Sequence, residues 1–260
     1  MTDPTPGTRP GQVKSATRAL EVLELLGVAR EPATFAGIGA ELRIPKSSLH
    51  SLLRTMTARG WLEVDSTGTR YRLGLRALLT GVAYIDMDDI VQLAQDVLDE
   101  LAARTGEAVH LGRLDGAEVV YLAKRESAHP LRMFSAVGRR LPTHATALGK
   151  AILAQLPVTE LADHLAVPLA ALTPSTITDP AVLRRELDSV RRAGFAEDAE
   201  ENSLEILCFA VALAPVRRSW NALSCSVPKS RLTPELRTVI VEGLTEAKQA
   251  IDARAAHLRQ

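Results

Sequence analysis

The segment 44–59 combines small hydroxyl side chains, a histidine and bases, and further bases flank it. Hydroxyl and imidazole groups can hydrogen-bond to the edges of DNA bases, and Lys and Arg attract backbone phosphates. The candidate DNA-contacting residues are Arg43, Lys46, Ser47, Ser48, His50, Arg54, Arg70 and Arg72. Clusters of surface bases are more often solvated faces, so the chemistry depends on an element that presents these side chains together.

A helix-turn-helix is the element that the surrounding pattern predicts. Apolar residues recur with a helical period over 14–30, 35–42 and 46–59, and Thr34 is expected to cap the second helix. One face of the third helix is apolar, formed by Leu49, Leu52, Leu53 and Met56. This arrangement leaves the hydroxyls and bases toward solvent, and it makes the third helix the expected DNA reader.

A basic hairpin is expected directly after these helices. Strand-type segments at 61–64 and 71–73 flank the turn 66–69, of sequence Ser-Thr-Gly-Thr. Helices followed by such a hairpin indicate a winged helix-turn-helix domain over 13–75. The alternative is a winged helix that contacts only proteins.

Charge is distributed unevenly along a chain that is neutral in total. Residues 43–76 contain seven bases and two acids, whereas 77–260 contain 20 bases and 24 acids. A basic module joined to a mildly acidic one is typical of a nucleic-acid reader with an attached sensor. The two cysteines, Cys208 and Cys225, lack the spacing of a zinc module, so no metal and no cofactor are indicated.

The overall composition places the chain among folded proteins outside the membrane. Its 260 residues are 46% hydrophobic, which argues against disorder and suggests two domains of ordinary size. The longest apolar stretch, 207–216, is too short for a membrane helix. Residues 1–12, rich in Thr, Pro and Gly, are expected to form a disordered arm rather than a secretory signal, and we expect a cytoplasmic protein.

The remainder of the chain is expected to be an α+β domain. A linker helix is predicted over 76–88, followed by a domain over 89–258. The strand patterns cover 107–114, 118–124, 131–135, 206–213 and 221–227, and the helical ones cover 145–155, 159–165, 180–193 and 234–258. An antiparallel sheet covered by helices fits this order.

Three segments of this domain suggest a ligand pocket. The helix that begins near Ala145 has small residues and free N–H groups at its start, which could receive a carboxylate, although it could also be an ordinary capped helix. The acidic segment 194–202 is usually a solvated turn. Ser224 and Ser226 share one face of a strand, where a polar ligand, a cross-strand partner or buried water could satisfy their hydroxyls.

Several motifs resemble those of one family of bacterial transcriptional regulators, the IclR family. They are the segments 14–23 (KSATRALEVL), 44–53 (IPKSSLHSLL) and 71–74 (YRLG), and the likeness extends over roughly 13–255. The resemblance implies a winged helix-turn-helix ahead of a GAF-like effector-binding domain, with the linker region pairing protomers. It also implies operator binding as a homodimer or a dimer of dimers, and a response to small organic acids, often aromatic ones.

The resemblance also implies a set of effector-binding residues. Matched to the family's pattern, they are Ala147, Leu148, Asp198, Cys208, Ser224 and Ser226. Leu148 is bulkier than the small residue expected at the start of the helix, and the segment 205–207 departs from the Gly usual just before the cysteine. Asp198 would repel a bound carboxylate, so its expected role is to hold the loop or to hydrogen-bond a hydroxyl group.

The leading interpretation is a regulator, not an enzyme, that binds double-stranded operator DNA with a pseudo-palindromic sequence and responds to a small carboxylic acid. One alternative is a hydrolase with Cys208 as nucleophile, His144 as base and Asp198 as orienting group. The flanking Leu207 and Phe209 instead indicate a buried, unreactive thiol. A second alternative is a small-molecule sensor that acts through protein partners without DNA.

Overall fold

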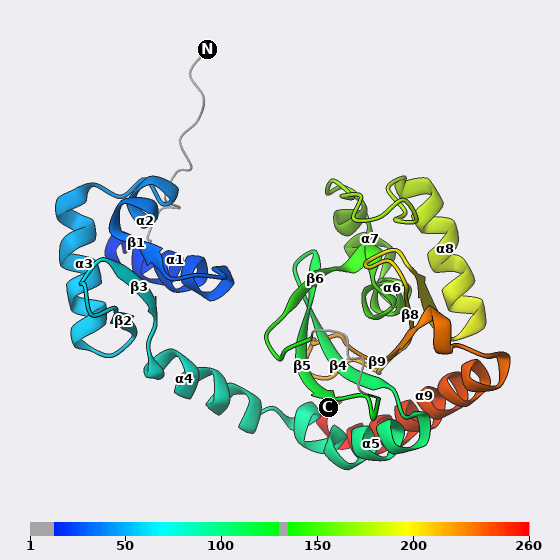
Figure 1. Cartoon of the computed structure of the whole chain (residues 1–260). Helices are drawn as coiled ribbons and strands as arrows, with labels where there is room; N and C mark the ends of the chain where they lie inside the picture. Colours follow the sequence, from blue (N-terminus) through cyan, green and yellow to red (C-terminus); the bar gives the residue numbers. More distant parts are fainter. Residues whose placement is uncertain (1–12, 130–134, 260) are drawn as a thin grey trace. The chain divides into compact units, whose positions relative to one another are not determined.

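The computed structural model describes residues 13–129 and 135–259, so the predicted arm 1–12 and most of the predicted strand 131–135 lie outside the described residues. The chain divides after Asp86 into two compact units (Figure 1). Among the described residues, no helix is long and apolar enough to cross a membrane.

The N-terminal unit consists of helices around a small sheet. Its elements are α1 (Lys14–Val28), β1 (Ala33–Thr34), α2 (Phe35–Glu41), α3 (Lys46–Ala58), β2 (Leu62–Val64), β3 (Arg70–Leu73) and α4 (Leu75–Asp86). The three strands pair antiparallel in the order β1-β3-β2. The predicted winged helix-turn-helix is therefore present, and the structure adds the two-residue strand β1, which the sequence pattern did not predict.

Local chemistry explains where these elements begin and turn. The Thr34 hydroxyl accepts the N–H of Gly37 and caps α2, as expected. In the β2–β3 turn, the Asp65 carboxylate accepts the backbone N–H groups of Thr69 and Arg70. Backbone hydrogen bonding, from Arg70 first, lowers the pKa of Asp65 below its usual value, so the charged carboxylate organises the turn at neutral pH.

The C-terminal unit is built on a six-stranded antiparallel sheet. The strands are β4 (Ala108–Asp115), β5 (Glu118–Arg125), β6 (Arg140–Pro142), β7 (Ala196–Ala199), β8 (Ile206–Ala212) and β9 (Asn221–Pro228). Their order across the sheet is β6-β5-β4-β9-β8-β7. The helices are α5 (Asp89–Thr105), α6 (Ala147–Leu153), α7 (Val158–Leu165), α8 (Pro180–Ala193) and α9 (Pro234–Arg254), with 3-10 turns η1 (Thr143–Ala145), η2 (Lys229–Arg231) and η3 (Ala256–Arg259).

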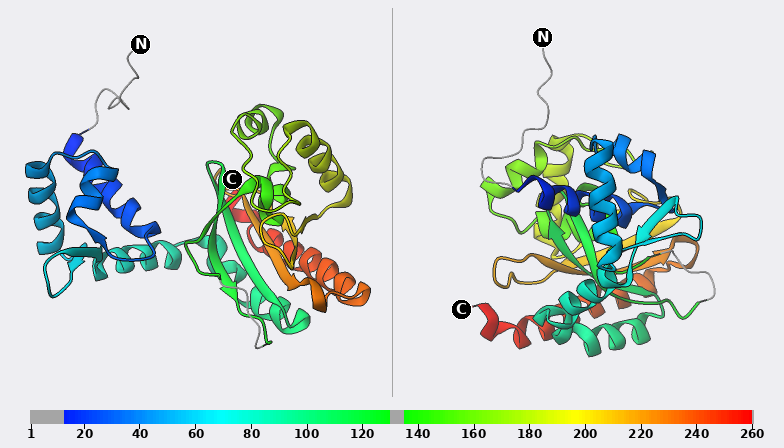
Figure 2. Two further views of the ribbon diagram at one scale, coloured as in Figure 1. Left: turned by 45° about the horizontal axis from the view of Figure 1, so that its top comes forward. Right: turned by 90° about the vertical axis from the view of Figure 1, so that its left-hand side faces the viewer.

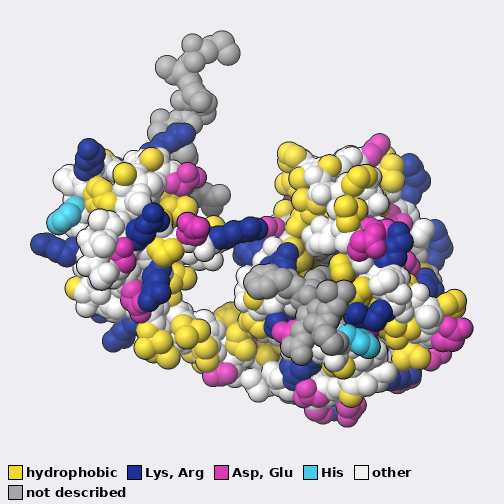
Figure 3. All heavy atoms as spheres, viewed as in Figure 1, with side chains coloured by type: hydrophobic (Ala, Val, Ile, Leu, Met, Phe, Trp, Pro, Cys, Tyr) yellow, Lys and Arg dark blue, Asp and Glu magenta, His cyan; other side chains and the backbone are white. Residues whose placement is uncertain are grey.

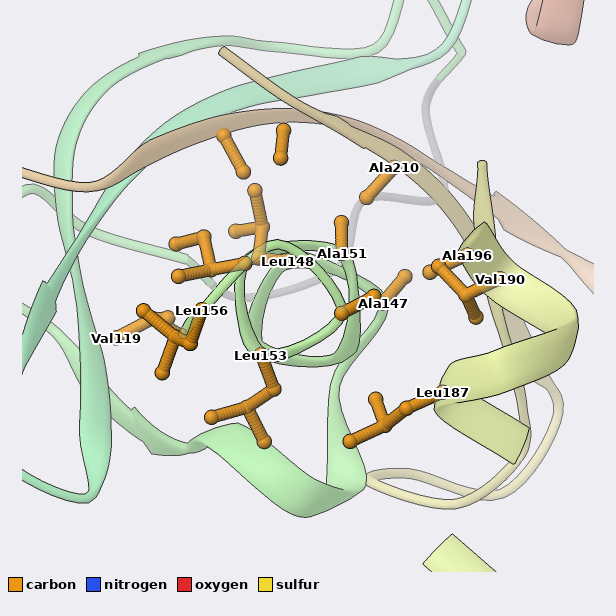
Figure 4. Packing of buried hydrophobic residues seen from close by; sticks show 14 of the residues in the cluster. Val119, Ala147, Leu148, Ala151, Leu153, Leu156, Leu187, Val190, Ala196 and Ala210 are labelled. Carbon is orange, nitrogen blue, oxygen red and sulfur yellow. The ribbon is translucent and has the colours of Figure 1, made fainter. Parts of the chain in front are cut away.

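Helices cover this sheet on both faces. The pair α5 and α9 lies along one face, and α6, flanked by α7 and α8, lies on the other (Figure 2). On that second face the first and last turns of α6 bury Leu148 and Ala151 against the strands, while Leu153 points away from them (Figure 4). The predicted α+β class with a GAF-like sheet is confirmed, and an apolar core of this unit lies on its α6 side.

One prediction for this unit was wrong, and one strand was not predicted. The acidic segment is not simply a solvated turn, because 196–199 forms the edge strand β7, in which Ala196 and Asp198 are buried. The structure also has a strand that was not predicted, β6 at 140–142. Both observed strands are four residues or fewer, too short for a period to be visible in the sequence.

We predict that Gly149→Ala strongly destabilises the C-terminal unit. A Cβ atom at Gly149 would lie 2.1 Å from the carbonyl oxygen of Thr143 and 2.3 Å from its Cα, and backbone atoms cannot move aside cheaply. We expect a loss of at least about 3 kcal/mol in the free energy of unfolding, measured by urea denaturation. Gly27→Ala is the control: no atom lies within 4 Å of its added Cβ, so a gain of up to about 1 kcal/mol is expected. Equal effects of the two substitutions would contradict the packing argument.

Candidate DNA interface and effector pocket

The exposed face of α3 carries the predicted DNA-contacting side chains. Leu49, Leu53 and Met56 are buried in the core of the N-terminal unit. All eight candidate residues are exposed, on α3, on β3 or, for Arg43, in the turn before α3. The structure therefore gathers these polar groups on the outside of one small unit, which is the geometry that groove reading requires.

The two bases of the wing are held in place by neighbours within the same unit. The guanidinium of Arg72 donates to the Glu63 carboxylate on the adjacent strand, at 2.7 and 3.0 Å, and remains exposed. Arg70 donates to the carbonyl oxygen of Pro32 at 3.2 Å. These contacts limit the number of conformations of both side chains, although an exposed ion pair such as Arg72–Glu63 adds little stability.

The six predicted effector-binding residues line one pocket in the C-terminal unit. Ala147 and Leu148 come from the first turn of α6, Asp198 from β7, Cys208 from β8, and Ser224 and Ser226 from β9. Register explains how the strand residues meet: Asp198 pairs with Cys208, and Cys208 pairs with Ser226. The pocket is small, with a volume of about 20 Å³.

Six further residues of the lining were not predicted. They are Tyr121, Leu141, Thr146, Asn202, Ser203 and Ile206. Thr146 could have been found from the sequence as an N-cap, because its hydroxyl accepts the N–H of Gly149 at the start of α6. The others carry no local signal, since they reach the pocket through strand pairing and through the loop after β7.

Asp198 combines burial with an organised set of hydrogen bonds. Its Oδ1 accepts the N–H groups of Glu201 at 2.7 Å and Asn202 at 3.3 Å, so the carboxylate holds the loop after β7. Burial raises the pKa of Asp198 to about 6, and the charge of Glu201 adds to this, whereas the two N–H donors and Lys150 act in the opposite direction. The carboxyl group therefore titrates close to neutral pH.

A buried ion pair lies behind the pocket. The Lys150 ammonium on α6 donates to Glu201 at 2.5 Å and to Glu186 on α8 at 3.3 Å. Lys150 is 1% exposed, so its charge would be very costly without these carboxylates. The pair joins α6 to the loop that carries Glu201. Because both elements line the pocket, the pair connects two of its walls.

The contacts of Cys208 do not support the nucleophile hypothesis. Its thiol donates to the Ser226 hydroxyl at 3.2 Å, and burial raises the thiol pKa well above its usual range. His144 instead pairs through Nε2 with the carbonyl oxygen of Ala170 at 3.0 Å. A thiol held protonated, with the proposed base bonded elsewhere, is a poor nucleophile. Within 13–129 and 135–259 there is also no cluster of three or more metal-ligating side chains.

The fold and its two sites define a helix-turn-helix regulator with a separate effector domain, and sequence comparison identifies its family. The family model described as the IclR helix-turn-helix domain matches residues 15–66, and the model of the bacterial transcriptional regulator IclR C-terminal matches residues 82–253. The chain belongs to the IclR family of transcriptional regulators.

Individual relatives agree over almost the whole chain. The HTH-type transcriptional regulator XynR of Escherichia coli is 37% identical, with 85% of this chain and 88% of that protein covered. The IclR transcriptional regulator of Alicyclobacillus acidocaldarius superposes with a TM-score of 0.84 at 28% identity, covering 93% and 98% of the two chains. An IclR homologue from Microbacterium hydrocarbonoxydans, complexed with 4-hydroxybenzoate, has a TM-score of 0.76 at 25% identity, covering 92% and 99%.

We predict that Asp198→Asn stabilises the protein at neutral pH. The folded-state pKa of about 6 lies above the unfolded value of 3.8, so the contribution of Asp198 to stability is greatest below pH 3.8 and is lost as the pH rises through about 6. Asn keeps the oxygen that accepts the two N–H groups and has no charge to bury. At pH 7.5 we expect the variant to be more stable by about 1–3 kcal/mol, with a smaller difference at pH 4.5, measured by urea denaturation. A wild type that is the more stable protein at pH 7.5 would show that the ionised carboxylate is favourable.

Proposed function

We propose that the protein is an effector-controlled regulator that binds a palindromic operator as a dimer, or as a dimer of dimers. The observation that carries this proposal is the exposed polar flank of α3 beside a basic wing. In this proposal, residues 13–75 form the DNA-binding domain, 76–88 form the linker helix and 89–258 form the effector-binding domain. A regulator of this kind acts where the chromosome is, in the cytoplasm.

Different residues of the interface have different tasks in this proposal. Ser47, Ser48 and His50 near the start of α3 contact base edges, because short side chains let the helix approach the major groove. The phosphate contacts come from Arg43, Lys46, Arg54, Arg70 and Arg72. Two α3 helices related by a two-fold axis would occupy successive major grooves, so the operator would be a pseudo-palindrome.

The helix α4 is the proposed surface for pairing two chains. None of its residues is buried, and Leu75, Leu78, Leu79 and Val82 recur at helical spacing while each is between 46% and 61% exposed. Figure 3 shows hydrophobic side chains gathered over this helix. An apolar stripe of this kind is costly in water, and a second copy of the same helix would cover it.

The C-terminal pocket is the proposed effector site, and its ligand a small organic acid. The hydroxyls of Ser224 and Ser226 can donate to a carboxylate, and both are nearly buried. The relative solved with 4-hydroxybenzoate shows that a protein of this fold accepts an organic acid. An acid that binds one quaternary arrangement better than another would change the spacing of the two DNA-reading helices.

The two alternatives have less support. A DNA-independent sensor would leave the exposed bases of α3 and the wing without a function. A Cys208 hydrolase would need a thiol that ionises and a histidine within reach of it, and the relatives are named as regulators rather than enzymes.

We predict that Lys46→Ala and Arg54→Ala each weaken operator binding several-fold. A lost phosphate contact releases fewer counterions, so the slope of log affinity against log salt should become less negative by about 0.9 per contact. Binding to the intergenic DNA beside the protein's own gene is measured by gel shift at several salt concentrations. Arg184→Ala, an exposed base on α8, is the control and should change neither quantity. Unchanged affinity and slope for both test variants would remove these residues from the interface.

We predict that Leu79→Glu weakens dimerisation. It places a charge in the middle of the apolar stripe on α4, where a second copy of the helix would have to bury it. Sedimentation at micromolar concentration should show a shift toward monomer and a parallel loss of operator affinity. Leu172→Glu, which also replaces an exposed leucine, is the matched control and should leave the assembly intact. If both variants sediment like wild type, α4 does not pair the chains.

A further inference from the structure

We propose that Leu148 and Gly112 together limit the effector to short aliphatic acids of roughly two to four carbons, and that they exclude acids with an aromatic ring. This inference rests on the proposed effector site and specifies the size of its ligand. Leu148 then acts as a residue that determines specificity, at a position where the family pattern led us to expect a smaller side chain.

The Leu148 side chain fills part of the pocket. It comes from the first turn of α6, is 2% exposed and belongs both to the pocket lining and to the apolar core. In Figure 4 it projects from α6 toward the strands. A leucine here occupies volume that an alanine or a glycine would leave to a ligand.

Gly112 on β4 provides the space in which Leu148 lies. A Cβ atom at Gly112 would be 3.0 Å from Cδ1 of Leu148 and 3.7 Å from its Cδ2, so the leucine methyl groups rest where the strand lacks a side chain. At 3.0 Å the contact is tight, so the Leu148 side chain would have to move by a few tenths of an ångström away from β4. The glycine and the leucine are therefore complementary, and a side chain at 112 would reduce the pocket further.

The remaining volume sets the limit on the ligand. The pocket has about 20 Å³, whereas a single water needs about 10–15 Å³ measured in the same way. A short acid requires only small adjustments of the lining, but a benzene ring requires a side chain to leave. Tyr121, another large member of the lining, stacks on the buried His110 with the ring centroids 4.5 Å apart, which restrains it. Leu148 is therefore the side chain whose removal should change the selectivity.

The test compares four full-length proteins: wild type, Leu148→Ala, Gly112→Ala and Leu153→Ala. The probes are glycolate, pyruvate, benzoate and 4-hydroxybenzoate, and the readouts are the dissociation constant by calorimetry and the rise in melting temperature over each protein's own ligand-free value. Leu153→Ala is the matched control, because it removes the same atoms from a buried leucine of α6 that does not line the pocket.

We expect wild type to bind glycolate or pyruvate, and to bind benzoate and 4-hydroxybenzoate only very weakly. Leu148→Ala should bind a benzoate at least tenfold more tightly than wild type does, and Gly112→Ala should bind the short acid at least tenfold more weakly. Leu153→Ala should retain the wild-type preference. If Leu148→Ala does not fold, Leu148→Val replaces it, with the same direction of change expected.

Two results would overturn the size limit alone: benzoate binding to wild type as tight as that of the short acids, or the same selectivity in wild type, the Leu148 variant and Gly112→Ala. Failure of every acid to bind any of the four proteins would contradict the proposed acid effector, and the size limit with it. Operator binding does not involve the pocket residues, so a folded protein that binds no acid should still bind the operator. Loss of both activities would instead indicate a misfolded preparation.

Discussion

The pocket of the C-terminal unit depends on one buried charge, the ammonium of Lys150. With 1% of its surface exposed, it must be paired inside the protein, and Glu201 and Glu186 provide the partners. Glu201 also donates its N–H to Asp198, so the ion pair fixes the position of the loop that shapes the pocket. Burial raises the pKa of Glu201 despite the nearby lysine, which indicates that this arrangement costs free energy and is held by the packing of α6. In return for this free-energy cost, the ion pair fixes the positions of α6 and the loop after β7, which form the pocket walls.

Strand register explains why polar residues that are far apart in sequence meet on one face of the sheet. Asp198, Cys208 and Ser226 lie in line across β7, β8 and β9, and Ser224 and His110 form the next cross-strand pair toward β5. All lie on the face that α6 covers. A shift of one residue in any of these pairings would turn its side chains to the face covered by α5 and α9. The strand register therefore determines which side chains line the pocket.

The elements that the sequence predicted well are those with local causes. The helix α3 was predicted from four apolar residues at helical spacing, and the start of α2 from Thr34, whose hydroxyl accepts the N–H of Gly37. The strand β7 was missed because its acidic residues suggest solvent, whereas its environment is set by pairing with β8, a contact that no short segment reveals. Tyr121 and Ile206 were not predicted as pocket residues for the same reason: strand pairing brings them to the pocket. The six proposed effector-binding residues came from the family resemblance, and their position around one cavity depends on the register of three strands, β7, β8 and β9, and on α6.

The two proposed sites of this chain place polar groups under opposite conditions. The hydroxyls and bases of α3 are exposed, where charge interactions are screened by salt and desolvation costs little. Asp198, Ser224 and Ser226 are at most 4% exposed, where salt has little access and the cost of a charge depends on protonation. DNA affinity should therefore respond mainly to ionic strength and effector affinity mainly to pH. Because burial raises the pKa of Asp198 to about 6, the proposed acid effector, entering as an anion, would be repelled less once that carboxyl is protonated, and it would bind more tightly as the pH falls.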